Sequence, residues 1–487
     1  MTSKLRRLGS ETAIYGVSTV LGRFLTFFLT PLYTHVIEPA ELGEVANLFA
    51  LIAFANIFYS FGLESAFFRF FPRDDRAQSD RVFSLSFLSL AAISGLLTLI
   101  IMLAADVLRG PAQIDLGVDM VQAAGLIALF DALVLIPFAL LRMEGRARRF
   151  ALTKFAVIVL NVVANVAFLF VFQWGVAGIF YAGLLSSAAG LFMTADILWR
   201  RLRPHFDGAL LREMFRFGLP TIPASFAAIV LQLIDRPLLK ALAGADAVGI
   251  YQANYRLAIP MMMFVTVFDY AWKPFFLREA AGPAEEAKKL FARVMTWFVI
   301  AAMVIFLIVA FFMEFVVTTP LGGLTLIDAS YWGGLFIIPI VLGGYFFHGL
   351  STNLLVGPYI AKKTSLLAWS TLSAAIVNVL VNLLLIPSMG IAGAAWATFA
   401  AYLVGSIVLF LASRSLYPVQ YEWRRILIIV VLALADWATV EFLTQDWTLL
   451  PAVLCRLGGL LLFAIVLYFG GLLNTAELTS LRRLFRR

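Results

Sequence analysis

The feature that most constrains this chain is a series of long apolar segments that recurs from one end of the sequence to the other. Each segment has about 20 residues or more, the length that a helix needs to cross a bilayer. Lipid offers the backbone no hydrogen-bonding partner, so a segment inside it must satisfy its N–H and C=O groups internally. Strands of a membrane barrel are shorter, at about 10 residues, and alternate in polarity. The pattern therefore predicts an all-α, polytopic membrane protein.

We predict fourteen transmembrane helices from these segments. They cover residues 11–37, 42–71, 81–107, 117–142, 150–172, 175–199, 215–243, 247–277, 292–318, 331–361, 364–386, 390–413, 425–443 and 449–473. The first follows a basic stretch but is too long for a signal peptide, so we expect it to remain as a helix. Pro220 and Pro223 in the seventh segment and Pro260 in the eighth predict breaks or hinges in those helices.

The composition excludes the main soluble alternatives. Hydrophobic residues make up 62% of the chain and charged residues 14%, whereas soluble domains are about 45–50% apolar and about 25% charged. A soluble enzyme, a nucleic-acid-binding module and a disordered chain are therefore excluded. A single cysteine, Cys455, excludes an intramolecular disulfide, and three scattered histidines have no metal-ligand spacing. We expect no metal, no cofactor and no enzymatic activity, and the absence of a P-loop motif excludes an ATPase within this chain.

The net charge of +8 is explained by topology. Most of the 37 lysines and arginines lie in connections that fall on one side of the predicted helices, and cytoplasmic loops are the ones that collect such residues. Both termini are therefore predicted to be cytoplasmic. The loops on the other side are short and acidic, and none is long enough to form a folded catalytic domain.

Internal repeats divide the chain. The residues around Gly43 recur around Gly249, and the segment Gly175–Ala182 recurs at 390–397. We predict an N-terminal lobe at 1–202, a cytoplasmic linker at 203–214, a C-terminal lobe at 215–415, and a helix pair with a basic tail at 416–487. Six helices is an even number, so both lobes enter the membrane from the same side. A pseudo-two-fold axis along the membrane normal is expected, as in some transporters.

Two arginines lie deep inside predicted helices. Arg23 in the first helix and Arg256 in the eighth have no acidic residue three or four positions away. Buried charges in membranes usually face a cavity or a partner. We favour a cationic cavity between the lobes, because guanidinium groups suit phosphate oxygens. A structural pair of Arg23 with Asp131, at similar depth in the fourth helix, is the alternative.

Further charges lie nearer the predicted cytoplasmic surface. Glu64 and Asp269 occupy matching positions near the ends of the second and eighth helices, and Arg69 and Lys273 follow them. The acids either cap or pair structurally or form a charged gate. The basic residues either extend to the lipid headgroups or contribute to the cavity.

Other polar residues have a structural interpretation. Two asparagine pairs with i,i+4 spacing lie on single helix faces, where they can hydrogen-bond neighbouring helices. They are Asn161 with Asn165, and Asn378 with Asn382. Asp436 and Arg456 lie at equal depth on adjacent helices, which predicts an ion pair within the C-terminal hairpin.

The order of several short motifs resembles a known family. The motifs are LGSETAIYG at 8–16, PLYT at 31–34, PAELG at 39–43, GLESAFFR at 62–69 and the pair Asp235-Arg236. With the repeats, they are similar to the polysaccharide transporter branch of the multidrug/oligosaccharidyl-lipid/polysaccharide exporter superfamily, which includes O-antigen flippases. The resemblance covers about 5–415. It places Arg23, Arg69, Asp235 and Arg236 at family-like positions, and we expect Arg236 to bind substrate in the cationic cavity together with Arg23, Arg256, Arg69 and Lys273.

The resemblance implies a fold and a function. It implies two six-helix lobes around a central cavity, alternating access, the bacterial inner membrane, and cationic cavity residues that engage a polyprenyl-pyrophosphate-linked oligosaccharide. Membrane lipids and polysaccharide polymerase or assembly proteins are the implied partners, and we expect a monomer without nucleic acid. The membrane potential, or coupling to H⁺ or Na⁺ through Glu64, Asp131, Asp235 or Asp269, would drive transport.

Three alternatives stay open at this point. A drug or metabolite antiporter of the MATE type predicts acid-lined lobes that attract cations. A lipid II flippase is a close relative, and the two additional helices favour keeping it. A membrane enzyme such as an O-antigen ligase or polymerase needs a large catalytic loop outside the membrane, and the sequence offers none.

Overall fold

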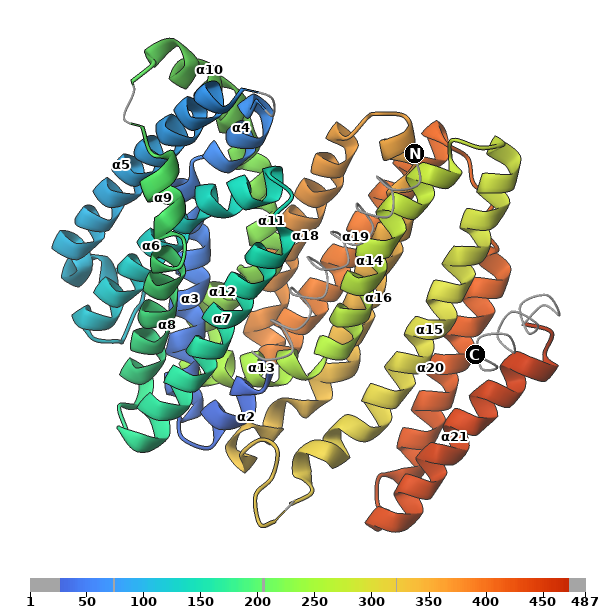
Figure 1. Cartoon of the computed structure of the whole chain (residues 1–487). Helices are drawn as coiled ribbons and strands as arrows, with labels where there is room; N and C mark the ends of the chain where they lie inside the picture. The colour runs from blue at the N-terminus through green and yellow to red at the C-terminus, as the bar shows by residue number, and fades with distance from the viewer. Residues whose placement is uncertain (1–26, 73–74, 204–205, 321, 473–487) are drawn as a thin grey trace. The chain divides into compact units, whose positions relative to one another are not determined.

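The structure is a computed structural model that describes residues 27–72, 75–203, 206–320 and 322–472, and in these ranges the chain forms helices joined by short connections (Figure 1). The all-α prediction is confirmed. Twelve helical segments of the described chain are long and apolar enough to cross a membrane. They are Pro39–Ser60, Arg76–Arg109, Val118–Met143, Ala147–Val171, Gly175–Arg201, Gly208–Leu233, Ala284–Thr318, Ala329–Ile360, Ser365–Met389, Ile391–Leu416, Trp423–Thr444 and Leu449–Phe469.

The predicted count of fourteen is not confirmed. The first predicted span lies mostly outside the described residues, which include only α2 (Leu29–Thr34) from it. The eighth predicted span is divided into α13 (Ala245–Leu257) and α14 (Ile259–Glu279), with Pro260 in the first turn of α14. Proline lacks the N–H that a continuing helix would bond, which accounts for the break.

Contacts group the chain into two compact units, which are described separately. Unit 1 comprises Met1–Arg256, Ile327–Ile337 and Ala368–Val404. Unit 2 comprises Leu257–Leu326, Ile338–Leu367 and Gly405–Arg487. This grouping follows proximity and does not test a sequence repeat, so the lobes at 1–202 and 215–415 stay a prediction.

Unit 1 is built around α6, which packs against α3, α5 and α8. Its helices are α2, α3 (Pro39–Ser60), α4 (Leu63–Phe70), α5 (Arg76–Arg109), α6 (Val118–Met143), α7 (Ala147–Val166), η1 (Ala167–Val171), α8 (Gly175–Phe192), α9 (Ala195–Arg201), α10 (Gly208–Gly218), η2 (Leu219–Thr221), α11 (Ile222–Leu233), α12 (Asp235–Ala243), α13, η3 (Ala329–Ile337), and most of α18 (Ser365–Met389) and α19 (Ile391–Leu416). Buried Phe67, Phe83 and Leu140 form the core at the predicted cytoplasmic end.

Two of these spans are broken, and the sequence explains where. Between α3 and α4, Phe61 and Gly62 both have left-handed backbones, with φ of 48° and 71°. Gly62 tolerates this conformation because it has no Cβ. Between α10 and α11, the short helix η2 contains Pro220. The hinge predicted from the prolines of the seventh segment lies at this position.

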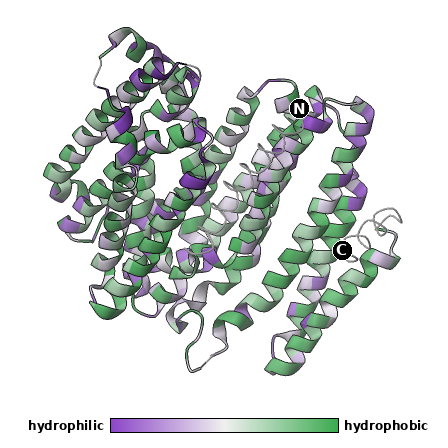
Figure 2. Cartoon of the chain, viewed as in Figure 1, coloured by the Kyte–Doolittle hydropathy of each residue, from purple (hydrophilic) through white to green (hydrophobic). Residues whose placement is uncertain are grey.

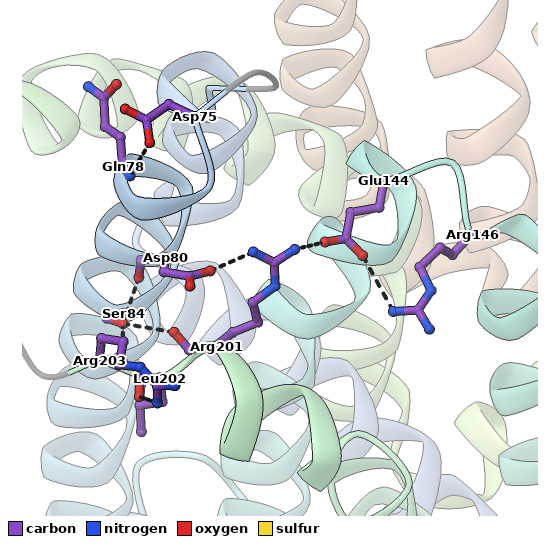
Figure 3. A network of polar contacts seen from close by, with 9 residues as sticks. All are labelled: Asp75, Gln78, Asp80, Ser84, Glu144, Arg146, Arg201, Leu202 and Arg203. Atoms are coloured by element: carbon purple, nitrogen blue, oxygen red, sulfur yellow. Dashed lines mark hydrogen bonds and ion pairs between the residues drawn. The ribbon is translucent and has the colours of Figure 1, made fainter.

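An ion-pair network fixes α9 at the predicted cytoplasmic end of unit 1 (Figure 3). Arg201 contacts Asp80 of α5 and Glu144 after α6, and Arg146 pairs with Glu144 at 3.4 Å. The Ser84 hydroxyl accepts a hydrogen bond from the Arg203 N–H at 2.7 Å. Some of the basic residues that set the predicted topology therefore also join helices.

Unit 2 is built around α15 (Ala284–Thr318), which packs against α14, α16 (Ile338–Leu354), α20 (Trp423–Thr444) and α21 (Leu449–Phe469). The short α17 (Val356–Ile360) contacts α14. Hydrophobic residues cover much of α15, α20 and α21 (Figure 2), as expected of helices that face lipid. Buried Trp272, Phe276 and Phe291 form the core of one end.

The C-terminal hairpin corrects one prediction. Arg456 of α21 pairs with Glu441 of α20, at 3.4 Å from Nη2 to Oε2, rather than with Asp436. Asp436 of α20 lies opposite Gly459 of α21, which is about one helical turn away from Arg456. The depth estimate from sequence was wrong by that turn, because it depended on uncertain helix ends.

Candidate functional site

Two cavities of unit 1 lie along α3. The first, which we call the cationic cavity, has a volume of about 420 Å³ and is lined by α3 residues from Leu42 to Ala50. The second, the acidic cavity, has about 410 Å³ and is lined by α3 residues from Ala53 to Ser60. Asp131 of α6 lines both cavities. The cationic cavity is therefore nearer the predicted extracellular end of α3.

Arg256, at the end of α13, lines the cationic cavity. Its Nη1 donates a hydrogen bond to the Thr30 hydroxyl of α2 at 3.3 Å. In the described part of the chain, no carboxylate lies within ion-pair distance of it. Arg256 is thus a cation with unused donors beside a cavity, an arrangement that suits an anionic ligand.

Arg236 of α12 lines the same cavity but is fully engaged. It pairs with Asp235, donates from Nε to Gln252 at 3.1 Å, and lies over the Tyr255 ring at 4.7 Å. The Tyr251 hydroxyl donates to the second oxygen of Asp235 at 2.7 Å. Asp235 and Arg236 are 2% and 5% exposed. This buried pair is well satisfied, so it orients the wall of the cavity and adds little net charge.

Neutral polar side chains of α2, α7 and α8 also line this cavity. The Tyr33 hydroxyl of α2 donates to Asn165 Oδ1 at 2.8 Å. Asn165 donates to the Asn161 carbonyl at 2.8 Å, and Asn161 donates to the Ser186 hydroxyl of α8 at 3.1 Å. This chain of bonds links α2, α7 and α8. In the other predicted copy, Asn382 donates to the carbonyl of Asn378 within α18 at 2.8 Å.

Carboxylates line the acidic cavity. The Ser187 hydroxyl donates to Asp131 at 2.7 Å, and Glu64 of α4 pairs with Arg142 at 3.3 Å. Ser60 and Ser225 complete its polar lining with Asn56. Glu64 and Asp131, predicted as candidates for gating or ion coupling, are therefore brought to one cavity.

The two cavities lie between two close backbone contacts. A Cβ on Gly43 would overlap the carbonyl oxygen of Ala245, and a Cβ on Gly249 would overlap that of Pro39. We call this contact of α3 with α13 the outer seam. Ala245 and Gly249 follow Pro39 and Gly43 by 206 positions each. Because Gly43 contacts Ala245 and Gly249 contacts Pro39, the contact is reciprocal, as two copies related by a two-fold axis would make it.

A second close contact, the inner seam, joins the breaks of the two broken spans. Cβ atoms on Gly62 and Gly218 would each overlap the other residue's carbonyl group. Phe61 packs edge-on against Phe215 with ring centroids 5.8 Å apart. Unit 1 is thus closed by backbone contacts on both sides of the cavities.

The outer seam also contains a buried ion pair. The Lys240 ammonium of α12 contacts Glu44 of α3, lies 3.3 Å from Asp115 Oδ2, and donates to the Gln113 carbonyl. The Lys240 and Glu44 side chains are 6% and 8% exposed, whereas Asp115 is 81% exposed. The hydrogen bond from Lys240 holds the pKa of the Asp115 carboxyl below its usual range.

Several predicted site residues do not reach these cavities. Arg23 lies outside the described residues. Arg69 is exposed on α4 and lines neither cavity. Lys273 pairs with Asp269 at 2.8 Å on α14, in unit 2.

The sequence analysis missed Glu44, Tyr33 and Ser187. The available signal was Lys240, four positions after Arg236 in an apolar segment, since a second cation on one helix face needs a partner. Glu44, next to the repeated Gly43, was a candidate for the acidic partner of Lys240.

Comparisons with known proteins agree with this architecture. The family described as polysaccharide biosynthesis protein matches residues 8–279. No curated protein matches the sequence. The lipid II flippase MurJ, in an inward closed conformation, is 13% identical with a TM-score of 0.75, and the match covers 94% of this chain and 99% of that chain.

A multidrug resistance MATE family transporter of the MOP superfamily is also similar. Its inward-facing conformation is 18% identical with a TM-score of 0.59, covering 81% of this chain and 94% of that chain. Its outward-facing conformation is 16% identical with a TM-score of 0.58, covering 84% and 95%. At these identities the likeness shows a shared fold, and the prediction of a MATE-like fold is confirmed.

Proposed function

Because the chain belongs to the polysaccharide biosynthesis protein family, we propose that it is a flippase for a lipid-linked oligosaccharide. The substrate is a polyprenyl-pyrophosphate carrying an O-antigen or related polysaccharide repeat unit, moved outward across the bacterial inner membrane. The observation that carries the proposal is Arg256, which lines a cavity and has no carboxylate partner among the described residues. Guanidinium groups bind phosphate oxygens with two parallel hydrogen bonds.

The physical problem of flipping fits this cavity. A charged head group must cross about 30 Å of hydrocarbon, where neither charge nor sugar hydroxyls are solvated. The cationic cavity replaces headgroup solvation with Arg256, Asn161 and Ser187 in its lining, while the lipid tail stays in the bilayer. Its 420 Å³ lies near the small end of ligand cavities, at about 300–1,000 Å³, so a long oligosaccharide requires the seams to open.

The membrane potential can drive this movement. Two negative charges that move outward gain roughly 4–5 kcal/mol at ~100 mV, inside negative. Coupling to H⁺ or Na⁺ is the alternative, with Asp131 and Glu64 as the carboxylates of the acidic cavity. Transport that persists without an ion gradient but stops without a potential would favour the first mechanism.

A second candidate is an antiporter for lipophilic cations. The acidic cavity favours it, since Glu64 and Asp131 would attract a cation. Arg256 opposes it in the neighbouring cavity.

Reconstituted protein distinguishes these functions. Liposomes are prepared with a polyprenyl-pyrophosphate oligosaccharide, and its appearance in the outer leaflet is measured with an impermeant glycosidase. The same oligosaccharide on a neutral polyprenol is the control. We expect protein-dependent flipping of the pyrophosphate form only. Transport of a lipophilic cation, without flipping of either glycolipid, would overturn the proposal.

A further inference from the structure

Two cations on one face of α12 serve different cavities. Arg236 lines the cationic cavity, and Lys240 lines a separate pocket of about 640 Å³ at the predicted extracellular end. Residues four apart on a helix lie on one face, about 6 Å apart along the axis. The α12 helix therefore carries one cation beside the cavity and another beside the pocket that follows it.

The Lys240 ammonium has three oxygen partners in this arrangement. It lies within ion-pair distance of Glu44 and Asp115 and donates a hydrogen bond to the Gln113 carbonyl. Glu44 also accepts the Asp115 N–H at 3.1 Å. The cluster thereby ties α12 to α3 and to the connection between α5 and α6, at the outer seam.

Opening of the outer seam would remove all three acceptors from α12. A desolvated ammonium without a partner is strongly unfavourable, so the open state requires water or another anion at Lys240. The proposed substrate supplies such an anion, which Arg256 holds in the cationic cavity. Phosphate and the Glu44 carboxylate would then be competing partners for one cation.

We propose that Lys240 is an exit latch, which closes the outer seam through Glu44 and Asp115 and binds the phosphate of the departing head group when the seam opens. This inference rests on the proposed function for its ligand, a polyprenyl pyrophosphate. Release is thereby linked to closure, because Glu44 regains Lys240 only after the phosphate has left.

Seam opening is measured without substrate. Cys455→Ser removes the only native thiol, and Ala46→Cys places a reporter in the cationic cavity. An impermeant maleimide is added from outside to intact cells. Glu44→Gln and Lys240→Gln are each expected to raise the labelling rate about tenfold. The exchange Glu44→Lys with Lys240→Glu should lower it again, though not to the original value, because Asp115 and the Gln113 carbonyl then face a carboxylate.

The matched control is Lys288→Gln, which breaks the Lys288–Glu285 pair on α15, where the acid is 78% exposed. It should leave labelling unchanged, as expected of an exposed pair. Unchanged labelling in both Glu44→Gln and Lys240→Gln overturns the latch. If neither variant is produced in folded form, Asp115→Asn tests it at an exposed position, where a rise of about twofold is expected.

Transport separates the phosphate role from a purely structural pair. In liposomes containing the polyprenyl-pyrophosphate oligosaccharide, the charge-exchanged variant keeps the seam pair but has no cation on α12 at that turn. We expect its flipping to be about tenfold slower than that of the unexchanged protein. Full recovery of flipping overturns phosphate binding by Lys240. Absence of flipping by the unexchanged protein contradicts the proposed function instead, while the labelling result still decides the latch.

Discussion

The cationic and acidic cavities share a wall and a residue, yet among the described residues basic side chains line only the first. Both are lined by α3 and by Asp131. Toward the predicted extracellular end, α3 faces α12 and α13, which supply Arg236 and Arg256. Toward the cytoplasmic end it faces α11, which supplies Ser225, Ala228 and Ile229, so the carboxylates of Glu64 and Asp131 dominate.

This difference indicates where an anion is stabilised inside unit 1. A phosphate is attracted by Arg256 in the cationic cavity, whereas the described lining of the acidic cavity has no basic side chain, and the low dielectric constant of the surroundings strengthens this difference. The acidic cavity lies on the side of the inner seam. An anion that has reached Arg256 is therefore opposed electrostatically on its way back.

The largest expected effect compares the two cavities directly. Arg256→Gln should slow flipping of the pyrophosphate lipid by about 10- to 100-fold, because it removes charge-assisted hydrogen bonds to the head group. Glu64→Gln, on the acidic side, should change the rate less than about threefold. Flipping is measured in liposomes at a fixed membrane potential.

The matched variant for this test is Arg256→Lys. Lysine keeps the charge but lacks the planar guanidinium that forms two parallel hydrogen bonds. The flipping rate of Arg256→Lys should therefore lie between that of the original protein and that of Arg256→Gln. Equal losses from Arg256→Gln and Glu64→Gln would remove the distinction between the cavities.

The sequence analysis predicted both arginines that line the cationic cavity, Arg256 from its depth and Arg236 from the family resemblance, and could not predict their surroundings. Arg256 was identifiable because an arginine in an apolar segment costs free energy unless it faces a cavity or a partner. Its neighbours Thr30 and Tyr33, both on α2, were not, since hydroxyl groups in helices are common and only tertiary packing selects among them.

The misplaced features have physical causes as well. The break between α13 and α14 was signalled by Pro260, but its place relative to Arg256 depended on how the helix ends pack. The Arg456 partner was assigned one turn away from Glu441, because apolar segments do not mark their own ends within a turn. The outer seam needed two backbones in contact, which no single segment specifies.

The two seams offer the second test. Gly43→Ala forces α3 and α13 apart at the outer seam, and Gly218→Ala forces apart the breaks at the inner seam. In the background with the thiol at position 46, we expect Gly43→Ala to raise outside labelling about tenfold and Gly218→Ala to leave it unchanged or lower.

Gly95→Ala on α5 is the control for the seams, since nothing lies within 4 Å of a Cβ at that position. Alanine there should be neutral or slightly stabilising, because glycine is a poor helix former. Similar labelling of all three variants would mean that the seams do not control access to the cationic cavity.

A smaller effect sharpens the description of the cationic wall. Asn165→Ala removes the acceptor of the buried Tyr33 hydroxyl and the link between α2 and α7, at a cost of about 1–3 kcal/mol. Asn382→Ala loses a bond within α18 and should cost about 1 kcal/mol or less. Thermal unfolding midpoints in detergent give the order, and a larger loss for Asn382→Ala would contradict it.

The smallest expected effect concerns the pH dependence of the outer seam. Because Lys240 holds the pKa of Asp115 below its usual value, Asp115 stabilises the folded seam fully above its unfolded pKa of about 4. That contribution is lost only as the pH falls through the lowered pKa. Ionisation of the reporter thiol makes the labelling rate itself rise with pH, so the rate of Asp115→Asn is divided by that of the original protein at each pH.

This ratio should be about two and constant from pH 5 to 8, since the exposed carboxylate stays ionised and is screened by solvent. A change in the ratio between pH 5 and 8 would show that Lys240 does not hold this carboxylate ionised.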